Sequence, residues 1–430
     1  MNLKPQKFNQ VWPQRGTLLI AGLFAVEHAT AGSILMTPPP VVATPPVVQE
    51  DEVGNEMNVF IPNGVSNGDS SQPFQYGPVT LHPHINYSFS YGSGIQSGVN
   101  NQQNSIIQQL SPGISADLGK HWSLDYTPTI HFYSNKEFRD GVDHSVSLSG
   151  STHYEDWTFG LSQAIGFTSD PLTETASQTD QQQYTTVLSA GYVFSDKISA
   201  DFDVNQGISL VSHLQDSYNR STMDWLNYQF WSRFNVGLGM GAGYTKVSTD
   251  NNSSANNPDS LDEQLQARAN WRATDKISFQ VSAGLEDQQF LASGYDDSLN
   301  PIFSATIQYQ PFQYTQISLA ASRTVGASDY YVTAQSSETT AVSLSLSQRL
   351  LGKYNLNLGV AYTQTEFTTS YGSIGTSRTD DGYSFNASIG RNFLKRGNWA
   401  ITYQYNDNES SVSGFGQQNH QIGFQIGYSY

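Results

Sequence analysis

Apolar and polar positions alternate strictly along the last stretch of the chain. In HQIGFQIGYSY, which starts at His420, every second position is apolar: Ile422, Phe424, Ile426, Tyr428 and Tyr430. The positions between them carry a polar side chain or glycine. Because successive side chains of a strand point to opposite faces, this stretch predicts a strand with one wholly apolar face.

The same alternation recurs from about residue 79 onward, in repeats of roughly 35 to 45 residues. Each repeat contains a short turn followed by an aromatic or β-branched residue and a new alternating run. Examples of such runs are WSLDY at Trp122, WTFGL at Trp157, YNLNLGV at Tyr354 and WAITY at Trp399. A propeller blade has a similar period but needs four strands. Two long strands per repeat instead favour an antiparallel meander of hairpins.

We therefore expect an all-β fold, a transmembrane antiparallel meander β-barrel of about eighteen strands. The strands are predicted near residues 79–91, 106–118, 122–133, 143–154, 157–167, 183–194, 198–211, 222–231, 234–246, 261–273, 277–290, 301–310, 314–326, 338–350, 354–366, 382–393, 398–407 and 419–430. Such strands are long enough to cross a bilayer at a tilt of about 45°. Closure requires the last strand to pair with the first, whose outward set is predicted to be Leu81, Ile85, Tyr87, Phe89 and Tyr91.

The predicted connections differ in length at the two ends of the barrel. One end has short turns, and the other has long polar loops such as 168–183, 250–260 and 368–381. Outer-membrane barrels have short periplasmic turns and long extracellular loops, and an even strand count leaves both termini on the same side. This arrangement predicts two periplasmic termini.

Composition agrees with a membrane barrel and excludes several other classes. Only 13% of the 430 residues are charged, against about 25% in soluble domains. There is no apolar run of about 20 residues such as a membrane helix needs. The net charge of −17 argues against a nucleic-acid partner. With no cysteine, the chain can form neither disulfides nor thiolate sites.

Two segments precede the predicted barrel. Residues 1–31 combine basic residues, the apolar core TLLIAGLFAV and the small-residue motif Ala29–Ala31, which predicts a secretory signal peptide; a short buried helix is the alternative. Residues 32–78 are proline-rich and then acidic. We interpret them as a periplasmic linker, with a contact to a periplasmic partner or a plug in the lumen as alternatives. The barrel then occupies 79–430.

If the apolar set of each strand faces lipid, the other set lines the lumen. The charged candidates for this lining are Asp117, Asp125, Asp201, Asp203, Arg268, Arg272, Glu286 and Arg349. Asp201 and Asp203 opposite Arg268 and Arg272 would form charged walls that orient a solute, or would simply be solvated. Four alternate glycines from Gly237 to Gly243 would leave one wall bare or let a loop or plug approach closely.

Aromatic residues and histidines suggest further roles. Trp122, Trp157, Tyr354 and Trp399 follow short turns and are expected to form an aromatic girdle at the periplasmic interface. His82 and His84 share a strand face, but two ligands without a third make a metal site less favoured than a polar lining. Acidic pairs at residues 296–297 and 380–381 are expected in loops. The pattern predicts no catalytic residue, cofactor or metal.

Signal peptide, hairpin repeats and aromatic C-terminus together resemble the outer-membrane β-barrel porins of Gram-negative bacteria, especially the β-barrel porin 2 group, which includes barrels of exopolysaccharide loci. The resemblance covers about 79–430 and includes no motif of fixed residues. It implies an outer-membrane location, contact with lipid and lipopolysaccharide, and insertion by the barrel-assembly machinery through the C-terminal strand. It leaves the oligomeric state open.

Three functions remain open from the sequence. The favoured one is a porin-like channel for passive diffusion of small hydrophilic solutes, saccharides among them. The alternatives are a conduit for exopolysaccharide export and a non-conducting barrel that acts as an adhesin or envelope scaffold. None of the three is an enzyme.

Overall fold

The computed structural model describes residues 74–93, 104–169, 171–172, 177–212, 215–249, 259–292, 296–327, 336–368, 378–413 and 416–430. The predicted signal peptide and nearly all of the proline-rich segment lie outside these residues. The described strands are β1 (Gln75–Tyr76), β2 (Val79–Ser93), β3 (Asn104–Leu118), β4 (Trp122–Tyr133), β5 (Gly141–Tyr154), β6 (Trp157–Thr168), β7 (Pro171–Leu172), β8 (Ser177–Gln178), β9 (Gln181–Ser195), β10 (Ile198–Val211), β11 (Gln215–Trp231), β12 (Phe234–Thr249), β13 (Ser260–Thr274), β14 (Ile277–Phe290), β15 (Ser298–Phe312), β16 (Thr315–Ala327), β17 (Ser336–Leu350), β18 (Tyr354–Thr368), β19 (Arg378–Phe393), β20 (Gly397–Ser410) and β21 (Gln417–Ser429).

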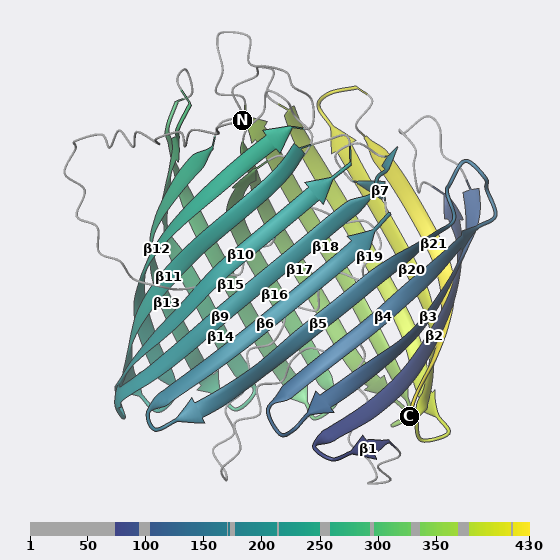
Figure 1. Cartoon of the computed structure of the whole chain (residues 1–430), viewed down its shortest axis with the longest axis horizontal. Helices are drawn as coiled ribbons and strands as arrows, with labels where there is room; N and C mark the ends of the chain where they lie inside the picture. Colours follow the sequence, from purple (N-terminus) through teal and green to yellow (C-terminus); the bar gives the residue numbers. More distant parts are fainter. Residues whose placement is uncertain are drawn as a thin grey trace, which may run out of the picture.

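The long strands form one closed antiparallel barrel (Figure 1). In the described residues the main sheet has 19 strands, of which the two-residue β1 only forms a short hairpin with β2, so 18 strands make the wall. Each of these 18 strands pairs with the next one of the wall, and β21 closes the circle on β2 from His84↔Ser429 to Ser93↔His420. The short strands β7 and β8 pair only with each other. The predicted meander and its closure by the last strand are therefore confirmed. Among the residues described, no helix is long and apolar enough to cross a membrane.

The two ends of the barrel differ, as the sequence predicts. We call the end with the short turns the turn end and the other the loop end. The C-terminus lies at the turn end (Figure 1). Gly119 and Gly352 turn the chain there with φ of 75° and 68°, values that glycine adopts at little cost. Tyr430 continues the contact between β21 and β2, because its backbone N–H donates to the Pro83 carbonyl at 2.9 Å.

The register assigns every strand residue to one of two faces. On β21, Ile422, Phe424 and Ile426 pair with apolar residues on both neighbouring strands, and large apolar side chains of this face are exposed all round the barrel. The opposite face is concave, because Arg268 of β13 reaches Asp201 of β10 across two intervening strands. Side chains converge in this way only inside a barrel. The apolar face is thus the outer one, as in a transmembrane barrel.

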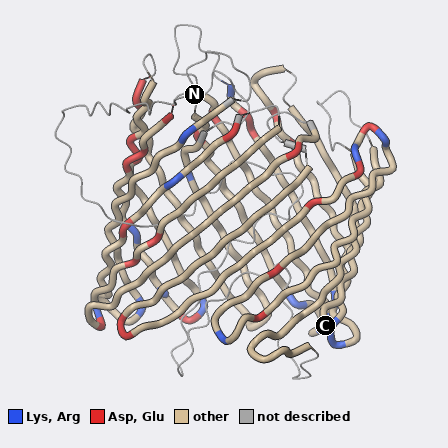
Figure 2. The backbone as a smooth tube through the Cα atoms, in the orientation of Figure 1, with Lys and Arg blue, Asp and Glu red and all other residues tan. Residues whose placement is uncertain are grey.

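Charged residues are sparse along the middle of the strands and gather toward both ends (Figure 2). The turn end of the outer face carries aromatic side chains. Trp157 packs with Tyr192 at 4.7 Å between ring centroids, and Tyr354 packs with Trp399 at 6.5 Å. The outer face therefore has the zones of a membrane barrel: aromatic at one rim, apolar in the middle and polar toward the loop end.

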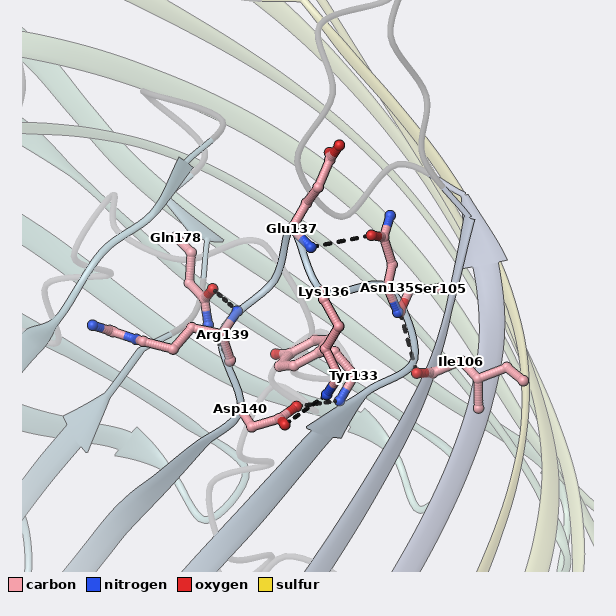
Figure 3. A network of polar contacts seen from close by, with 9 residues as sticks. All are labelled: Ser105, Ile106, Tyr133, Asn135, Lys136, Glu137, Arg139, Asp140 and Gln178. Atoms are coloured by element: carbon pink, nitrogen blue, oxygen red, sulfur yellow. Dashed lines mark hydrogen bonds and ion pairs between the residues drawn. The ribbon is translucent and has the colours of Figure 1, made fainter.

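At the loop end, the connection between β4 and β5 folds over the inner face (Figure 3). Phe138 of this loop is buried against Ile107 and Tyr133, two inward residues of β3 and β4. The neighbouring Arg139 exchanges two hydrogen bonds with Gln178 of β8: its N–H donates at 2.9 Å and its carbonyl accepts at 3.0 Å. An ordered loop thus covers part of the wall at the barrel mouth.

Two predicted boundaries were wrong. β11 starts at Gln215, not near residue 222, and β19 starts at Arg378, not near residue 382. The acidic pair Asp380–Asp381 therefore lies in a strand and not in a loop. Asp380 faces inward, where it pairs with Arg378, and Asp381 faces outward. The pair at 296–297 does lie in a loop.

Candidate channel lining

The structure places the sequence-predicted charged residues on the inner face. These are Asp117, Asp125, Asp201, Asp203, Arg268, Arg272, Glu286 and Arg349. The four girdle candidates Trp122, Trp157, Tyr354 and Trp399 lie on the outer face near the turn end. The apolar set of β21, from Ile422 to Tyr428, also faces outward. Tyr430 follows the strand and lies 5.7 Å from Phe74 between ring centroids.

One inner-wall network joins β10, β11 and β13. The Arg268 guanidinium donates to the Asp201 carboxylate and, from Nε at 3.0 Å, to Asn227 Oδ1. Asn227 Nδ2 in turn donates to Asp201 Oδ2 at 3.0 Å. The guanidinium also lies 4.3 Å from the ring centroid of Trp225. The charges therefore compensate each other on one wall and do not form the facing charged walls that the sequence suggested.

The glycines of β12 make this network possible. A β-carbon at Gly237 would lie 2.6 Å from Asn227 Oδ1, and one at Gly239 would lie 2.7 Å from the Trp225 ring. One at Gly241 would lie 2.8 Å from Met223 Sδ. The predicted bare wall is therefore wrong: glycine leaves the space in which side chains of β11 and β13 lie flat against the barrel.

A second inner-wall network occupies β2 to β5 and is built on histidine–aspartate pairs. His82 Nε2 lies 3.0 Å from Asp117 Oδ2, and His131 Nε2 lies 2.8 Å from Asp143 Oδ2. Between them, His84 Nε2 contacts Thr127 Oγ1 at 3.0 Å across Gly113 of β3.

These contacts give His82 and His84 separate partners. His82 is paired with Asp117, whereas His84 reaches Asp125 Oδ2 at 4.0 Å. Within the described residues, no three His, Cys, Asp or Glu side chains come together in a way that could hold a metal ion. Both histidines lie on the inner face, each beside its own polar partner.

A third group of polar residues lies on β13 and β14. Gln264 donates from Nε2 to Glu286 Oε2 at 2.8 Å, and Gln266 donates to Gln264 Oε1 at 3.0 Å. Glu286 is buried, as are Gln266 and Gln288 beside it. Sequence reasoning named Glu286 but missed the buried Arg378–Asp380 pair, because that stretch was assigned to a loop. Together the groups make a lining of amides, hydroxyls, histidines and charged groups, of which Asp201–Arg268 and Asp380–Arg378 are ion pairs.

The fold and this lining define a transmembrane β-barrel with a polar interior. No protein-family model matches the sequence. No curated protein matches it either. The membership in the β-barrel porin 2 group that the sequence suggested stays a prediction.

Solved structures of outer-membrane barrels resemble this fold. OpdL of Pseudomonas aeruginosa has a TM-score of 0.44 and 12% identity, over 82% of this chain and 98% of that one. OccAB4 of Acinetobacter baumannii has a TM-score of 0.43 and 11% identity, over 81% and 98%. The siderophore receptor PirA of P. aeruginosa has a TM-score of 0.40 and 11% identity, over 80% of each chain. The likeness is one of barrel architecture alone.

Proposed function

We propose that the chain is an outer-membrane channel for passive diffusion of small hydrophilic solutes, with uncharged saccharides as the favoured class. The observation that carries the proposal is the polar lining on a barrel of 18 strands. Barrels of 16 to 18 strands are wide enough to leave an aqueous lumen, whereas barrels of about eight are filled by side chains.

The chemistry of the lining supports uncharged solutes. Amide and hydroxyl side chains such as Asn227, Gln264 and Thr127 can exchange hydrogen bonds with sugar hydroxyls. The principal inner arginines are paired, Arg268 with Asp201 and Arg378 with Asp380, so they do not form an open cationic track for anions.

The test is a pair of measurements on the refolded full-length protein. In planar bilayers we expect discrete ion-conducting steps. In liposome swelling we expect monosaccharides to enter faster than disaccharides, and disaccharides faster than trisaccharides. A barrel that is folded by heat-modifiable gel migration but passes neither ions nor sugars would reject the channel and leave the adhesin or scaffold class.

A further inference from the structure

The apolar belt of the outer face is interrupted on β11. From the turn end, its outward residues begin as Phe230, Tyr228 and Leu226 and continue as Asp224, Thr222, Arg220 and Tyr218. On β12 the corresponding series is apolar as far as Ala242 and continues with Tyr244 and Lys246. Arg220 pairs in register with Tyr244, and Lys246 with Tyr218. The two cations are thus diagonal neighbours, about 7–8 Å apart at the backbone.

A cavity of about 240 Å³ lies at this position. Its side-chain lining comes from three adjacent strands: Gln206, Ile208, Tyr218, Arg220, Tyr244 and Lys246. All six belong to the outward set of β10, β11 and β12, so the cavity opens on the surface that faces lipid. It combines two cations and an amide with two tyrosines and an isoleucine.

Neither cation forms an ion pair within the part of the chain that the structure describes. Arg220 and Lys246 are both exposed and make no ion pair or hydrogen bond with another residue that the structure describes. The carboxylate of Asp259 accepts the Tyr244 hydroxyl at 2.8 Å, and that of Asp216 accepts the Val211 N–H at 3.1 Å. Each of the two acids thus has a hydrogen-bond partner other than Arg220 or Lys246.

The surroundings make this pair of cations unusual. Outward strand residues at the loop end are otherwise mostly acidic or neutral, as at Glu366, Asp381 and Glu409. Arg323, another outward cation in this half, is paired with Glu338. A cation on a lipid-facing surface is costly unless an anion joins it. Among the described residues no acid pairs with Arg220 or Lys246, so the two cations can accept an anionic ligand.

We propose that the outer-face cavity binds the phosphate group of a phosphorylated glycolipid in the leaflet at the loop end. Arg220 and Lys246 would donate to the phosphate oxygens, since guanidinium and ammonium groups both bind phosphate. Tyr218 and Tyr244 supply amphipathic rings of the kind that contacts lipid head groups. Ile208 offers apolar contact to the acyl chains. The proposal requires that the barrel spans a bilayer and is independent of conduction.

The experiment is native mass spectrometry of the refolded full-length protein in detergent. The probes are diphosphorylated lipid A, the same lipid after enzymatic removal of its phosphates, and sodium phosphate alone. The test variant is Arg220→Gln with Lys246→Gln. The matched control is Lys197→Gln with Lys353→Gln, which removes the same charge from exposed lysines at the turn end of the barrel.

We expect wild type and control to retain one diphosphorylated lipid, and the test variant to retain it at least tenfold less. Removal of the phosphates should abolish retention by wild type, a comparison that needs no variant to fold. Equal retention by the test variant, or of the dephosphorylated lipid, would overturn the site. Binding of sodium phosphate without retention of lipid would overturn the lipid assignment. Conductance of the same samples tests the channel proposal separately, so loss of lipid binding can be told apart from loss of conduction.

Discussion

Gly239 shows how a single inner-face residue sets the arrangement of its neighbours. A β-carbon there would lie 2.7 Å from the Trp225 ring, and the Arg268 guanidinium lies 4.3 Å from the centroid of the same ring. By contrast, Gly166 also faces inward, and a β-carbon there would meet nothing within 4 Å. Comparing alanine substitutions at the two glycines therefore separates the effect of a steric clash from the general effect of replacing glycine in a strand.

We expect Gly239→Ala to destabilise the barrel by about 1–3 kcal/mol, the usual cost of an added group in a filled space. Gly166→Ala is expected to be neutral or to stabilise by about 0.4–1 kcal/mol, because it restricts the unfolded chain. Urea unfolding in lipid vesicles, followed by tryptophan fluorescence, measures both. Equal effects of the two substitutions would contradict the steric account.

The face on which a side chain lies also decides the cost of a charge. Phe424 and Ile426 of β21 face outward, opposite Phe89 and Tyr87 of β2, whereas Gln425 faces inward opposite Ser88. Arginine on the lipid face costs roughly 2–4 kcal/mol near the bilayer midplane. We expect Phe424→Arg and Ile426→Arg to impair folding strongly and Gln425→Arg to have little effect. Heat-modifiable migration after refolding checks this, and equal loss in all three variants would contradict the assigned faces.

At the scale of elements, the carboxylate of Asp140 links two parts of the β4–β5 connection (Figure 3). Asp140 accepts from Lys136 Nζ at 2.8 Å and from the Tyr133 N–H at 2.8 Å. These hydrogen bonds, that of Lys136 foremost, lower the pKa of Asp140 from its ordinary 3.8. A lowered pKa means that the carboxylate stabilises the docked loop fully above pH 3.8. This contribution is lost as the pH falls through the still lower pKa of the folded state.

We therefore expect the protection of the Tyr133 amide against hydrogen exchange, corrected for the intrinsic rate, to be constant from pH 7 to pH 5 and to fall below pH 3.8. Asp140→Asn should reduce the protection at pH 6 and flatten its pH dependence. Glu137→Gln is the control, because the Glu137 carboxylate points away from this network (Figure 3). A wild-type profile that matches Asp140→Asn at every pH would contradict the role of this carboxylate.

Elements with a clean alternation could be predicted from the sequence, and those without it could not. In β18, polar and apolar residues alternate from Tyr354 onward, and its predicted start agrees with the structure. In β11, Asp224 and Arg220 face outward while Met223 and Trp225 face inward, so the pattern is reversed where the strand begins. The assumption that apolar residues face outward is wrong for this part of β11. The proposed lipid site lies in the same part of the strand.

The lining was predictable as a set of inward residues but not as networks. Asp201 and Arg268 are 67 residues apart, and their contact depends on the registers of three strand pairs and on glycine at 237 between them. Alternation gives the face of each side chain but not its neighbours along the circumference. The His84–Thr127 contact across Gly113 was missed for the same reason.

At the scale of the whole molecule, inner-face acids outnumber inner-face arginines. The acids are Asp117, Asp125, Asp143, Asp201, Asp203, Asp262, Glu286 and Asp380, and the arginines are Arg268, Arg272, Arg349 and Arg378. Acid-lined pores favour cations. Arg268 and Arg378 are paired with Asp201 and Asp380, so the other inner-face acids in this list still outnumber the other arginines, Arg272 and Arg349.

We therefore predict a weak cation preference in planar bilayers, which fades in 1 M salt, where the screening length falls to about 3 Å. Asp201→Asn with Asp203→Asn should reduce or reverse this cation preference, because the variant removes two acids and leaves Arg268 without its carboxylate. The channel should stay open. The conservative control is Asp201→Glu with Asp203→Glu, which keeps both charges. An unchanged preference in the asparagine variant would mean that these residues do not face the ion path.

Deletion of 32–73, the part of the proline-rich segment 32–78 that precedes the described residues, tests the role of this segment in the same bilayers. Unchanged conductance supports a linker, and a large increase supports a plug.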